Sequence, residues 1–132
     1  MPDKGLLVPA EALLELCKSK KLTLATAESC TGGLVAAALS EIPGSSLVLD
    51  RGFVTYSNEA KQQMLGVTPA TIDVYGAVST ECAEEMAKGA LAHASVRASA
   101  MSARQSSDTP ISARPVSTSR RAMGTVVARR GR

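Results

Sequence analysis

The stretch from Ala25 to Leu34, ATAESCTGGL, concentrates small residues with several hydroxyl groups and one thiol. A short strand over 22–24 precedes it and apolar residues at helical spacing follow it, so we expect a strand-to-helix turn. Such a turn exposes the Ser29 hydroxyl and the Cys30 thiol beside a helix N-terminus, where free N–H groups and the helix dipole favour negative charge. The turn is therefore a candidate site for an oxyanion, a phosphate or an activated nucleophile.

The same turn also has a purely structural interpretation. Thr31 is a common type of helix N-cap, and Gly32 and Gly33 would ease the packing of the helix on the strand. Turns built from small residues are frequent in proteins that combine strands and helices. From the spacing alone, a reactive turn and an ordinary capped turn are equally supported.

Apolar periodicity, capping residues and helix breakers predict the elements that must position this turn. A first helix should cover 6–20, and a second should run from Leu34 to the stop at Pro43-Gly44. After Gly44 we expect a strand over 47–56 with a bulge at Gly52. A helix over 59–65 should be capped by Asn58 and ended by Gly66, and Thr68-Pro69 should begin a further turn of helix. A last helix should be capped by Ser79 and run through Leu91.

Length and composition limit the class of protein. A chain of 132 residues allows one domain with a modest core, and because aromatic residues make up only 2% of it, aliphatic side chains must fill that core. There is no apolar run long enough for a membrane span and no signal peptide, so we expect a cytoplasmic protein. Three cysteines without a CxxC pair argue against a disulfide framework or a zinc site, and we expect neither metal nor cofactor. His93, the only histidine, would have to serve any Ser-His-Asp triad, and we expect no catalytic role for it.

Charge is divided unequally along the chain. Residues 1–92 carry seven basic and eleven acidic side chains, a net charge of −4, whereas residues 93–132 carry eight arginines and one aspartate, a net charge of +7. All thirteen leucines lie at or before Leu91, and residues 94–132 contain no aromatic residue. Such a segment cannot bury enough apolar surface to offset the entropy of ordering it. We therefore predict a domain over residues 1–93 and a largely disordered tail over residues 94–132.

Four blocks in order carry a family resemblance: the Ser29 stretch, PGSS at 43–46, DRGFVTYSNEAK at 50–61 and GAVS at 76–79. With them, residues 5–92 resemble the C-terminal domain of the competence/damage-inducible CinA proteins, whose stand-alone members are PncC-like nicotinamide-nucleotide amidohydrolases. The resemblance implies a layered α/β fold and the deamidation of nicotinamide mononucleotide to nicotinate mononucleotide and ammonia. It also implies a homo-oligomer, usually a dimer, that binds a small-molecule nucleotide.

Amide hydrolysis needs a nucleophile, a base that takes its proton, and donors that face the developing oxyanion. Ser29 on its turn can supply the nucleophile, and Lys61 can supply the base if it is buried, since a desolvated ammonium loses its proton readily. Tyr56, five residues before Lys61, can relay or orient a proton through its hydroxyl. By resemblance, the family assigns the nucleophile, the lysine and the tyrosine to these three positions.

The resemblance also indicates residues that bind the substrate. The backbone N–H groups of Thr31, Gly32 and Gly33 are candidates to hold the oxyanion or the substrate phosphate. Ser46 and Arg51 match motif positions of the family, but their side chains suggest no particular role in the chemistry.

Each assignment has a structural alternative. Ser29 can simply cap a helix, Lys61 can be a solvated lysine on a short helix, and Tyr56 can be a half-buried strand residue with its hydroxyl in water. Cys30 is a rival nucleophile, although we expect its thiol to be buried as a small apolar group.

Residues 94–132 depart from the family resemblance. The family continues with an apolar strand, a glycine-rich loop, a further strand and a last helix, and nothing in this arginine- and serine-rich segment resembles them. A shifted reading frame or a truncation is the leading explanation, which would leave the α/β fold incomplete at its C-terminus. The alternative is a genuine basic tail on a non-enzymatic protein that binds nucleic acid or another polyanion. A deamidase assay and salt-dependent retention on nucleic acid distinguish these two classes.

Overall fold

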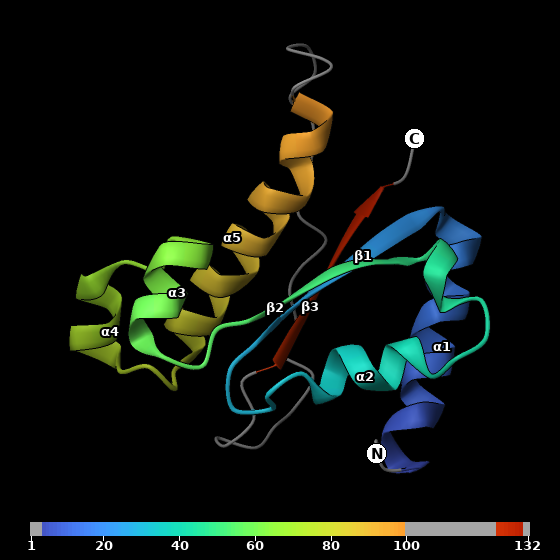
Figure 1. Cartoon of the computed structure of the whole chain (residues 1–132), viewed down its shortest axis with the longest axis horizontal. Coiled ribbons are helices and arrows are strands. Elements are labelled where there is room, and N and C mark those ends of the chain that lie inside the picture. The colour runs from blue at the N-terminus through green and yellow to red at the C-terminus, as the bar shows by residue number, and fades with distance from the viewer. Residues whose placement is uncertain (1–3, 100–123, 131–132) are drawn as a thin grey trace.

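Residues 4–99 and 124–130 are described by the structure, a computed structural model. In chain order, the elements are α1 (Lys4–Lys20), β1 (Leu22–Glu28), α2 (Leu34–Ser40), a short 3-10 helix η1 (Ser45–Leu47), β2 (Leu49–Val54), α3 (Asn58–Leu65), α4 (Pro69–Tyr75), α5 (Thr80–Ser99) and β3 (Gly124–Arg130). The strands cross the middle of the molecule, with α3 and α4 beyond one end of them and α1 toward the other (Figure 1). No helix within these described ranges is long and apolar enough to cross a membrane.

The described strands form one sheet in the order β2–β1–β3, with β1 in the centre. β1 runs parallel to β2, with Glu28 opposite Val54, and antiparallel to β3, with Glu28 opposite Gly124. The predicted strand over 22–24 is too short, because β1 continues through Glu28. The low strand propensity of its alanines is overridden, since a central strand gains hydrogen bonds along both of its edges.

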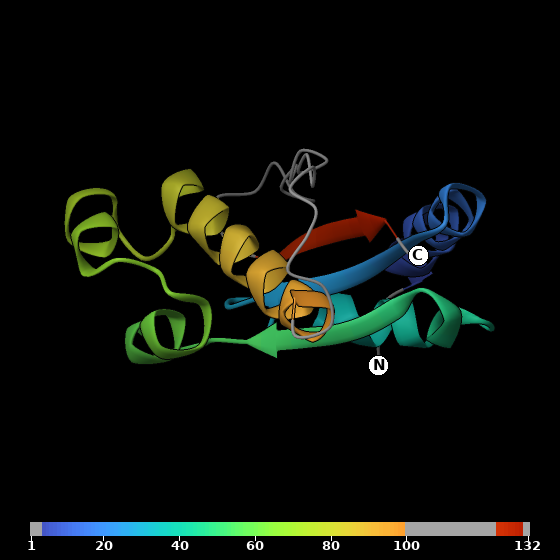
Figure 2. The same cartoon turned by 90° about the horizontal axis from the view of Figure 1, so that it is seen from above.

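Helices cover both faces of this sheet (Figure 2). On one face, Ala25 and Ala27 of β1 join buried residues of α5 and Val127 of β3 in one core cluster. On the opposite face, Leu22 and Leu24 pack with buried residues of α1 and α2. The alternation of β1 thus divides the core into two aliphatic layers, and the predicted layered α/β fold is confirmed.

Most capping residues behave as the sequence predicts. Thr68 and Ser79 cap α4 and α5 through their hydroxyl groups, and Gly66 ends α3 with a φ of 68°. The predicted cap at Asn58 is wrong, because the hydroxyl of Ser57 accepts a backbone N–H of the first turn of α3 at 3.0 Å. Asn58 is instead the first residue of the helix.

β2 is shorter than the predicted strand over 47–56, because η1 occupies the residues before it. Its pairing with β1 shifts register at Asp50, which is the extra residue of a bulge, so the predicted bulge at Gly52 is wrong. Gly52 is instead a place of close approach between strands. A Cβ at that position would lie 2.5 Å from Thr26 Oγ1, so a larger residue there would force the Thr26 side chain to move.

Parts of the predicted tail belong to the fold. α5 continues to Ser99, and β3 pairs with β1 along its whole length and places Val127 in the core, 2% exposed. The expectation of disorder is therefore wrong for these two segments. The physical reason is that the β-branched run Thr125–Val127 can complete the hydrogen bonds along an otherwise open edge of the central strand. Residues 100–123 lie outside the described residues, and the domain boundary at residue 93 stays a prediction.

Candidate active site

The Ser29 turn lies between the end of β1 and the start of α2, as the sequence predicts. The turn is tight, since the Gly32 N–H donates to the Ser29 carbonyl at 3.0 Å. Ser29 is only 4% exposed, so the expectation of an exposed hydroxyl is wrong. Cys30 is exposed, so the expectation of a buried thiol is also wrong. β1 is longer than expected and is buried through Glu28, so Ser29 directly follows a buried strand end and Cys30 lies further out in the turn.

Thr31 does not cap the helix that follows the turn. The N-cap of α2 is Gly33, with a φ of 104° and no capping side chain of its own. This φ lies in the left-handed region that favours glycine. The Thr31 hydroxyl points back toward the strand, where it donates to Glu28 Oε1 at 2.7 Å.

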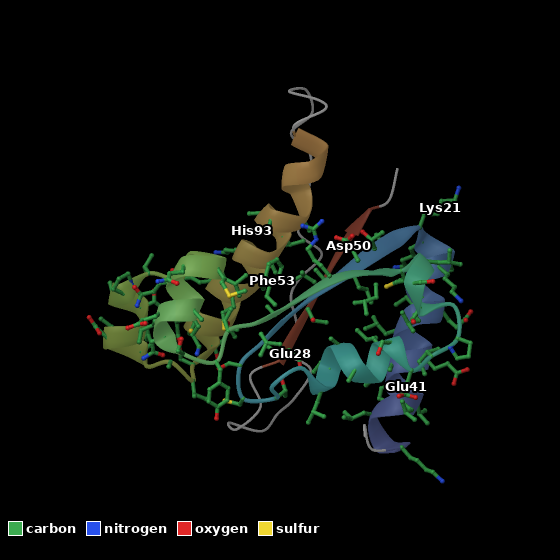
Figure 3. All side chains as sticks on the ribbon, viewed as in Figure 1. Lys21, Glu28, Glu41, Asp50, Phe53 and His93 are labelled. Atoms are coloured by element: carbon green, nitrogen blue, oxygen red, sulfur yellow. The ribbon has the colours of Figure 1, made fainter. Side chains whose placement is uncertain are left out.

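Glu28, the last residue of β1, provides the cap that the turn lacks. Its carboxylate is fully buried and accepts the backbone N–H of Val35 at 2.8 Å and that of Ala36 at 3.2 Å, in addition to the Thr31 hydroxyl. Figure 3 shows Glu28 where β1 meets the beginning of α2. The sequence analysis missed this residue, because β1 is buried at every position from Leu24 to Glu28 and no local pattern marks a buried carboxylate at its end.

The Glu28 carboxylate limits what else the start of α2 can bind. The positive end of that helix already faces a negative charge, and a phosphate there would meet like charge. The Gly32 N–H is engaged within the turn, so the prediction that it donates to a ligand is not supported. The N–H groups of Thr31 and Gly33 have no hydrogen-bond partner among the described residues, and they remain candidates for an oxyanion.

Lys61 lies in the first half of α3 and is 2% exposed, so the interpretation as a solvated lysine is wrong. Its Nζ donates to the Tyr56 carbonyl at 3.1 Å and forms no ion pair with any carboxylate in the described part of the chain. The side chain lies near Cys82 of α5. Burial raises the pKa of the Cys82 thiol, and the positive charge of Lys61 partly offsets this effect. A buried ammonium with a single carbonyl partner is the most unusual electrostatic feature of these residues.

Tyr56 follows the end of β2, and its side chain is 74% exposed, so the interpretation as a half-buried strand residue is wrong. Its observed link to Lys61 passes through its backbone carbonyl, not through its hydroxyl. The ring is therefore accessible to a ligand, while the backbone of the same residue holds the lysine.

These residues come together because β1 and β2 are parallel neighbours. The carboxyl ends of parallel strands meet at one edge of the sheet, and the Thr55 N–H donates to the Glu28 carbonyl at 2.8 Å at that edge. The Ser29 turn follows β1 there, and Tyr56 follows β2. α3 then begins and returns Lys61 toward the sheet, so the structure brings Ser29, Tyr56 and Lys61 to the same edge.

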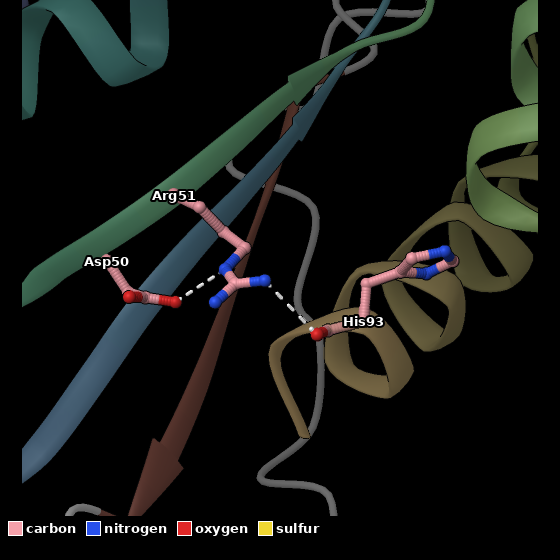
Figure 4. Close-up of polar contacts among 3 residues, drawn as sticks. All are labelled: Asp50, Arg51 and His93. Atoms are coloured by element: carbon pink, nitrogen blue, oxygen red, sulfur yellow. Dashed lines mark hydrogen bonds and ion pairs between the residues drawn. The ribbon is translucent and has the colours of Figure 1, made fainter. Parts of the chain in front are cut away.

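Ser46 and Arg51 are not brought to this edge. Ser46 is exposed in η1, which precedes β2 and lies at the opposite end of the strand. Arg51 pairs with Ala25, four residues before Ser29 and so about 13 Å away along the strand. Its Nε contacts Asp50 Oδ2 at 2.6 Å and its Nη1 donates to the His93 carbonyl at 3.2 Å (Figure 4). Arg51 therefore joins β2 to α5.

His93 has a packing role in the structure. Its ring meets Phe53 edge-on with centroids 5.6 Å apart, and its Nδ1 lies 2.8 Å from the Gly89 carbonyl (Figure 3). Among the described residues, no group of three or more His, Cys, Asp or Glu side chains could hold a metal ion.

Comparison with known proteins identifies the family of the chain. A model of the CinA C-terminal domain matches residues 8–104. The chain belongs to the CinA C-terminal domain family. It is 59% identical over 81 residues to a CinA-like protein of Chloroherpeton thalassium, covering 61% of this chain and 19% of that protein. It is 54% identical over 78 residues to a putative competence-damage inducible protein of Caldanaerobacter subterraneus, covering 59% and 19% of the two. The chain thus spans about a fifth of the length of these curated relatives.

Solved structures of the family share the fold. The competence/damage inducible protein CihA from Agrobacterium tumefaciens superposes with a TM-score of 0.67 at 48% identity, over 70% of this chain and 56% of that one. The competence damage-inducible protein A from Klebsiella pneumoniae superposes with a TM-score of 0.65 at 39% identity, over 67% and 55% of the two chains. These CinA relatives support the α/β assignment over the greater part of the sequence.

Proposed function

We propose that this CinA-family chain hydrolyses the carboxamide of nicotinamide mononucleotide to give nicotinate mononucleotide and ammonia. The observation that carries the proposal is the buried Lys61, which has no carboxylate partner among the described residues and lies at the sheet edge that carries Ser29. A buried lysine of this kind is suited to accept a proton from a neighbouring hydroxyl. The identity of the substrate rests on the family resemblance.

The reaction would begin with attack of Ser29 Oγ on the carboxamide carbon. The amine of Lys61 takes the hydroxyl proton as the C–O bond forms, and the carbonyl oxygen becomes an oxyanion. The N–H groups of Thr31 and Gly33, which have no partner in the described part of the chain, donate to that oxygen. The C–N bond then breaks, and the nitrogen leaves as ammonia with the proton returned by Lys61.

The resulting ester is then hydrolysed. Lys61 takes a proton from a water molecule, the hydroxide attacks the ester carbonyl, and Ser29 leaves with its proton restored while the nicotinate carboxylate departs. Tyr56 has two parts in this scheme. Its carbonyl orients Lys61, and the hydroxyl of its exposed ring can relay a proton to the departing nitrogen.

We also propose that the chain works as a homodimer. Among the described strands, β2 pairs only with β1, so its outer edge is open. Leu34, Val54 and Tyr56 leave apolar surface exposed near this edge, at 47%, 45% and 74%. Such a surface is typical of an interface. Size-exclusion chromatography with light scattering tests the proposal, and a monomer at micromolar concentration would contradict it.

The test of the activity uses the 132-residue chain with nicotinamide mononucleotide, with ammonia release and nicotinate mononucleotide measured separately. Ser29→Ala should abolish most turnover because it removes the attacking atom. Lys61→Ala should lose a comparable amount, and the double variant should be hardly worse than either, because nucleophile and base act as one unit. Cys30→Ser is the matched control and should remain active. Full activity in Ser29→Ala together with loss in Cys30→Ser would move the nucleophile by one residue and refute the assignment.

A further inference from the structure

Four basic residues meet at the end of the sheet that lies opposite the candidate active site. β3 runs antiparallel to β1, and their register pairs Arg130 with Leu22 and Arg129 with the residue after Leu22. Lys20 ends α1 and Lys21 directly precedes Leu22, so the start of β1 brings two lysines next to the two arginines. We call this set the basic cluster: Lys20, Lys21, Arg129 and Arg130.

The two lysines are exposed, and neither forms an ion pair with a carboxylate in the described part of the chain. In Figure 3, the side chain of Lys21 points away from the sheet, beyond the start of β1. The attraction between a cation and the C-terminus of a helix accounts for Lys20. It does not account for Lys21, whose φ of 55° lies in the left-handed region. A lysine therefore stands where the backbone alone would favour a glycine.

The fold gains nothing from bringing these charges together. Adjacent residues are about 3.8 Å apart and paired strands about 4.8 Å apart, so both lysines lie within roughly 10 Å of Arg130 along the backbone. Like charges at this separation repel one another. A ligand with several negative charges that spans the cluster would offset the repulsion. The chemistry that suits the cluster is therefore that of a polyanion.

The surroundings of the cluster favour duplex nucleic acid among the polyanions. Single strands are held by bases that stack on aromatic rings. The aromatic side chains lie elsewhere, with Phe53 in β2, Tyr56 after it and Tyr75 at the end of α4. A membrane surface requires an apolar face beside the basic residues, whereas the two lysines are flanked by exposed Ser19 and buried Leu22. A duplex carries one charge per about 1.7 Å of its axis and can be held through phosphates alone.

Charge is polarised along the sheet. α3, α4 and the first turns of α5 lie toward the other end of the strands (Figure 1) and carry five acidic residues: Glu59, Asp73, Glu81, Glu84 and Glu85. This polarity directs a polyanion to the basic cluster and away from the acidic end. The seven residues of β1 place about 20 Å between the cluster and the Ser29 turn, so a duplex at the cluster leaves the candidate active site uncovered.

We propose that the basic cluster binds the phosphate backbone of duplex nucleic acid without reading its sequence. This function goes beyond the proposed amide hydrolysis, because it uses other residues at the other end of the sheet. β3 is essential to it, since its pairing with β1 brings the two arginines to the lysines.

The test measures the binding of the 132-residue chain to a fluorescein-labelled DNA duplex of about 20 base pairs, by fluorescence anisotropy over a range of salt concentrations. The first variant combines Lys20→Gln with Lys21→Gln. Its control combines Lys4→Gln with Lys88→Gln, which removes the same charge from exposed positions of α1 and α5. The cluster variant should bind at least about tenfold more weakly at about 50 mM salt, and the slope of log K against log salt should shrink by about 2. The control should stay within about threefold of the wild type.

A second pair of variants tests the arginines. Arg129→Gln combined with Arg130→Gln should weaken binding as the lysine variant does. Arg120→Gln combined with Arg121→Gln removes the same charge from residues outside the described ranges, and it should bind within about threefold of the wild type. Thermal denaturation is measured for every variant. If the arginine variant unfolds, the lysine variant still decides, because its two positions lie outside β3.

Three outcomes overturn the proposal. Equal losses in the cluster variants and their controls would show that net charge alone accounts for binding. Wild-type affinity in the lysine variant would show that the cluster does not touch the duplex. Tighter binding to phosphatidylserine vesicles than to the duplex, with the same dependence on the cluster, would assign the surface to membranes instead. Turnover of nicotinamide mononucleotide should be unchanged in the lysine variant, so failure of the proposed activity and failure of this proposal are read from separate assays.

Discussion

Replacing Gly89 by alanine should destabilise the protein, although alanine is the better helix former. Gly89 lies in α5, where this helix crosses the C-terminal end of α3. An ideal Cβ on Gly89 would lie 2.0 Å from the Leu65 carbonyl oxygen, 2.7 Å from its carbon and 2.8 Å from its Cα. All three atoms belong to the backbone, so no side-chain rotation can relieve the overlap.

The expected magnitude follows from two opposing effects. In an unhindered helix, glycine to alanine stabilises by up to about 1 kcal/mol. Here the methyl group needs a separation of at least 3.0 Å from the Leu65 oxygen, so the two helices must separate by about 1 Å. Leu65, Met86 and Ala90 are at most 2% exposed, and separation would loosen this packing. Overpacking of a core costs about 1–3 kcal/mol, and with rigid backbone as the obstacle we expect the upper end, for a net loss of about 2 kcal/mol.

Urea denaturation followed by far-ultraviolet circular dichroism measures the difference. Lys88→Ala is the control, because Lys88 is the exposed neighbour of Gly89 on the same helix. A Gly89→Ala variant as stable as the wild type, or more stable, would refute the close contact of α3 with α5. Lys61 lies one turn before Leu65 on α3, so the displacement should also slow the proposed turnover of nicotinamide mononucleotide.

Two further predictions concern buried or bonded carboxylates. Glu28→Gln should destabilise the protein by about 2 kcal/mol in urea denaturation, because the amide group of glutamine cannot accept from all three donors at the start of α2 as a carboxylate does. Glu41→Gln, at the exposed far end of the same helix, is the control. Equal denaturation midpoints for the two variants would contradict the capping role of Glu28. The Thr71 side chain makes the largest contribution to lowering the pKa of Glu85, and Thr68, whose hydroxyl donates to Glu85 Oε1 at 3.1 Å, contributes less. This carboxylate should therefore stabilise the contact of α4 with α5 above its ordinary pKa of 4.5 and lose that effect as pH falls through its lower folded value. The stability difference between wild type and Glu85→Gln should therefore be present at pH 7 and shrink below about pH 4.5, and a difference that grows on acidification would contradict the assignment.

Local signals in the sequence predict local structure well. The caps at Thr68 and Ser79, the stop at Gly66 and the strand-to-helix turn at Ser29 are each decided by a few neighbouring residues, and the structure confirms them. Family motifs added the residues that meet at the sheet edge. They also indicated Ser46, which the structure leaves at the other end of β2, because a motif match carries no distance.

Features that depend on distant contacts could not be predicted in this way. The sequence predicts the seven residues of β3 to be part of a disordered basic tail, because their own pattern does not indicate a strand. Their pairing with the otherwise open edge of β1 explains why they form one. Burial of Lys61 depends on α3 folding back against α5, which no pattern within α3 reveals. The exposure of Cys30 and the burial of Ser29 follow from the length of β1, which its alanines concealed.

Buried polar groups concentrate at one edge of a sheet whose cores are otherwise aliphatic. Glu28, Ser29, Thr55 and Lys61 are each at most 4% exposed, and two of them lack any side-chain partner among the described residues. A protein selected for stability alone would place apolar side chains at these positions, because an unpaired buried polar group weakens the fold. The Glu28 carboxylate accepts three hydrogen bonds and fixes the turn, whereas the hydroxyls of Ser29 and Thr55 have no partner among the described residues. A satisfied carboxylate that holds the backbone, together with hydroxyls that have no partner at the edge that carries Lys61, is the arrangement that the proposed site requires.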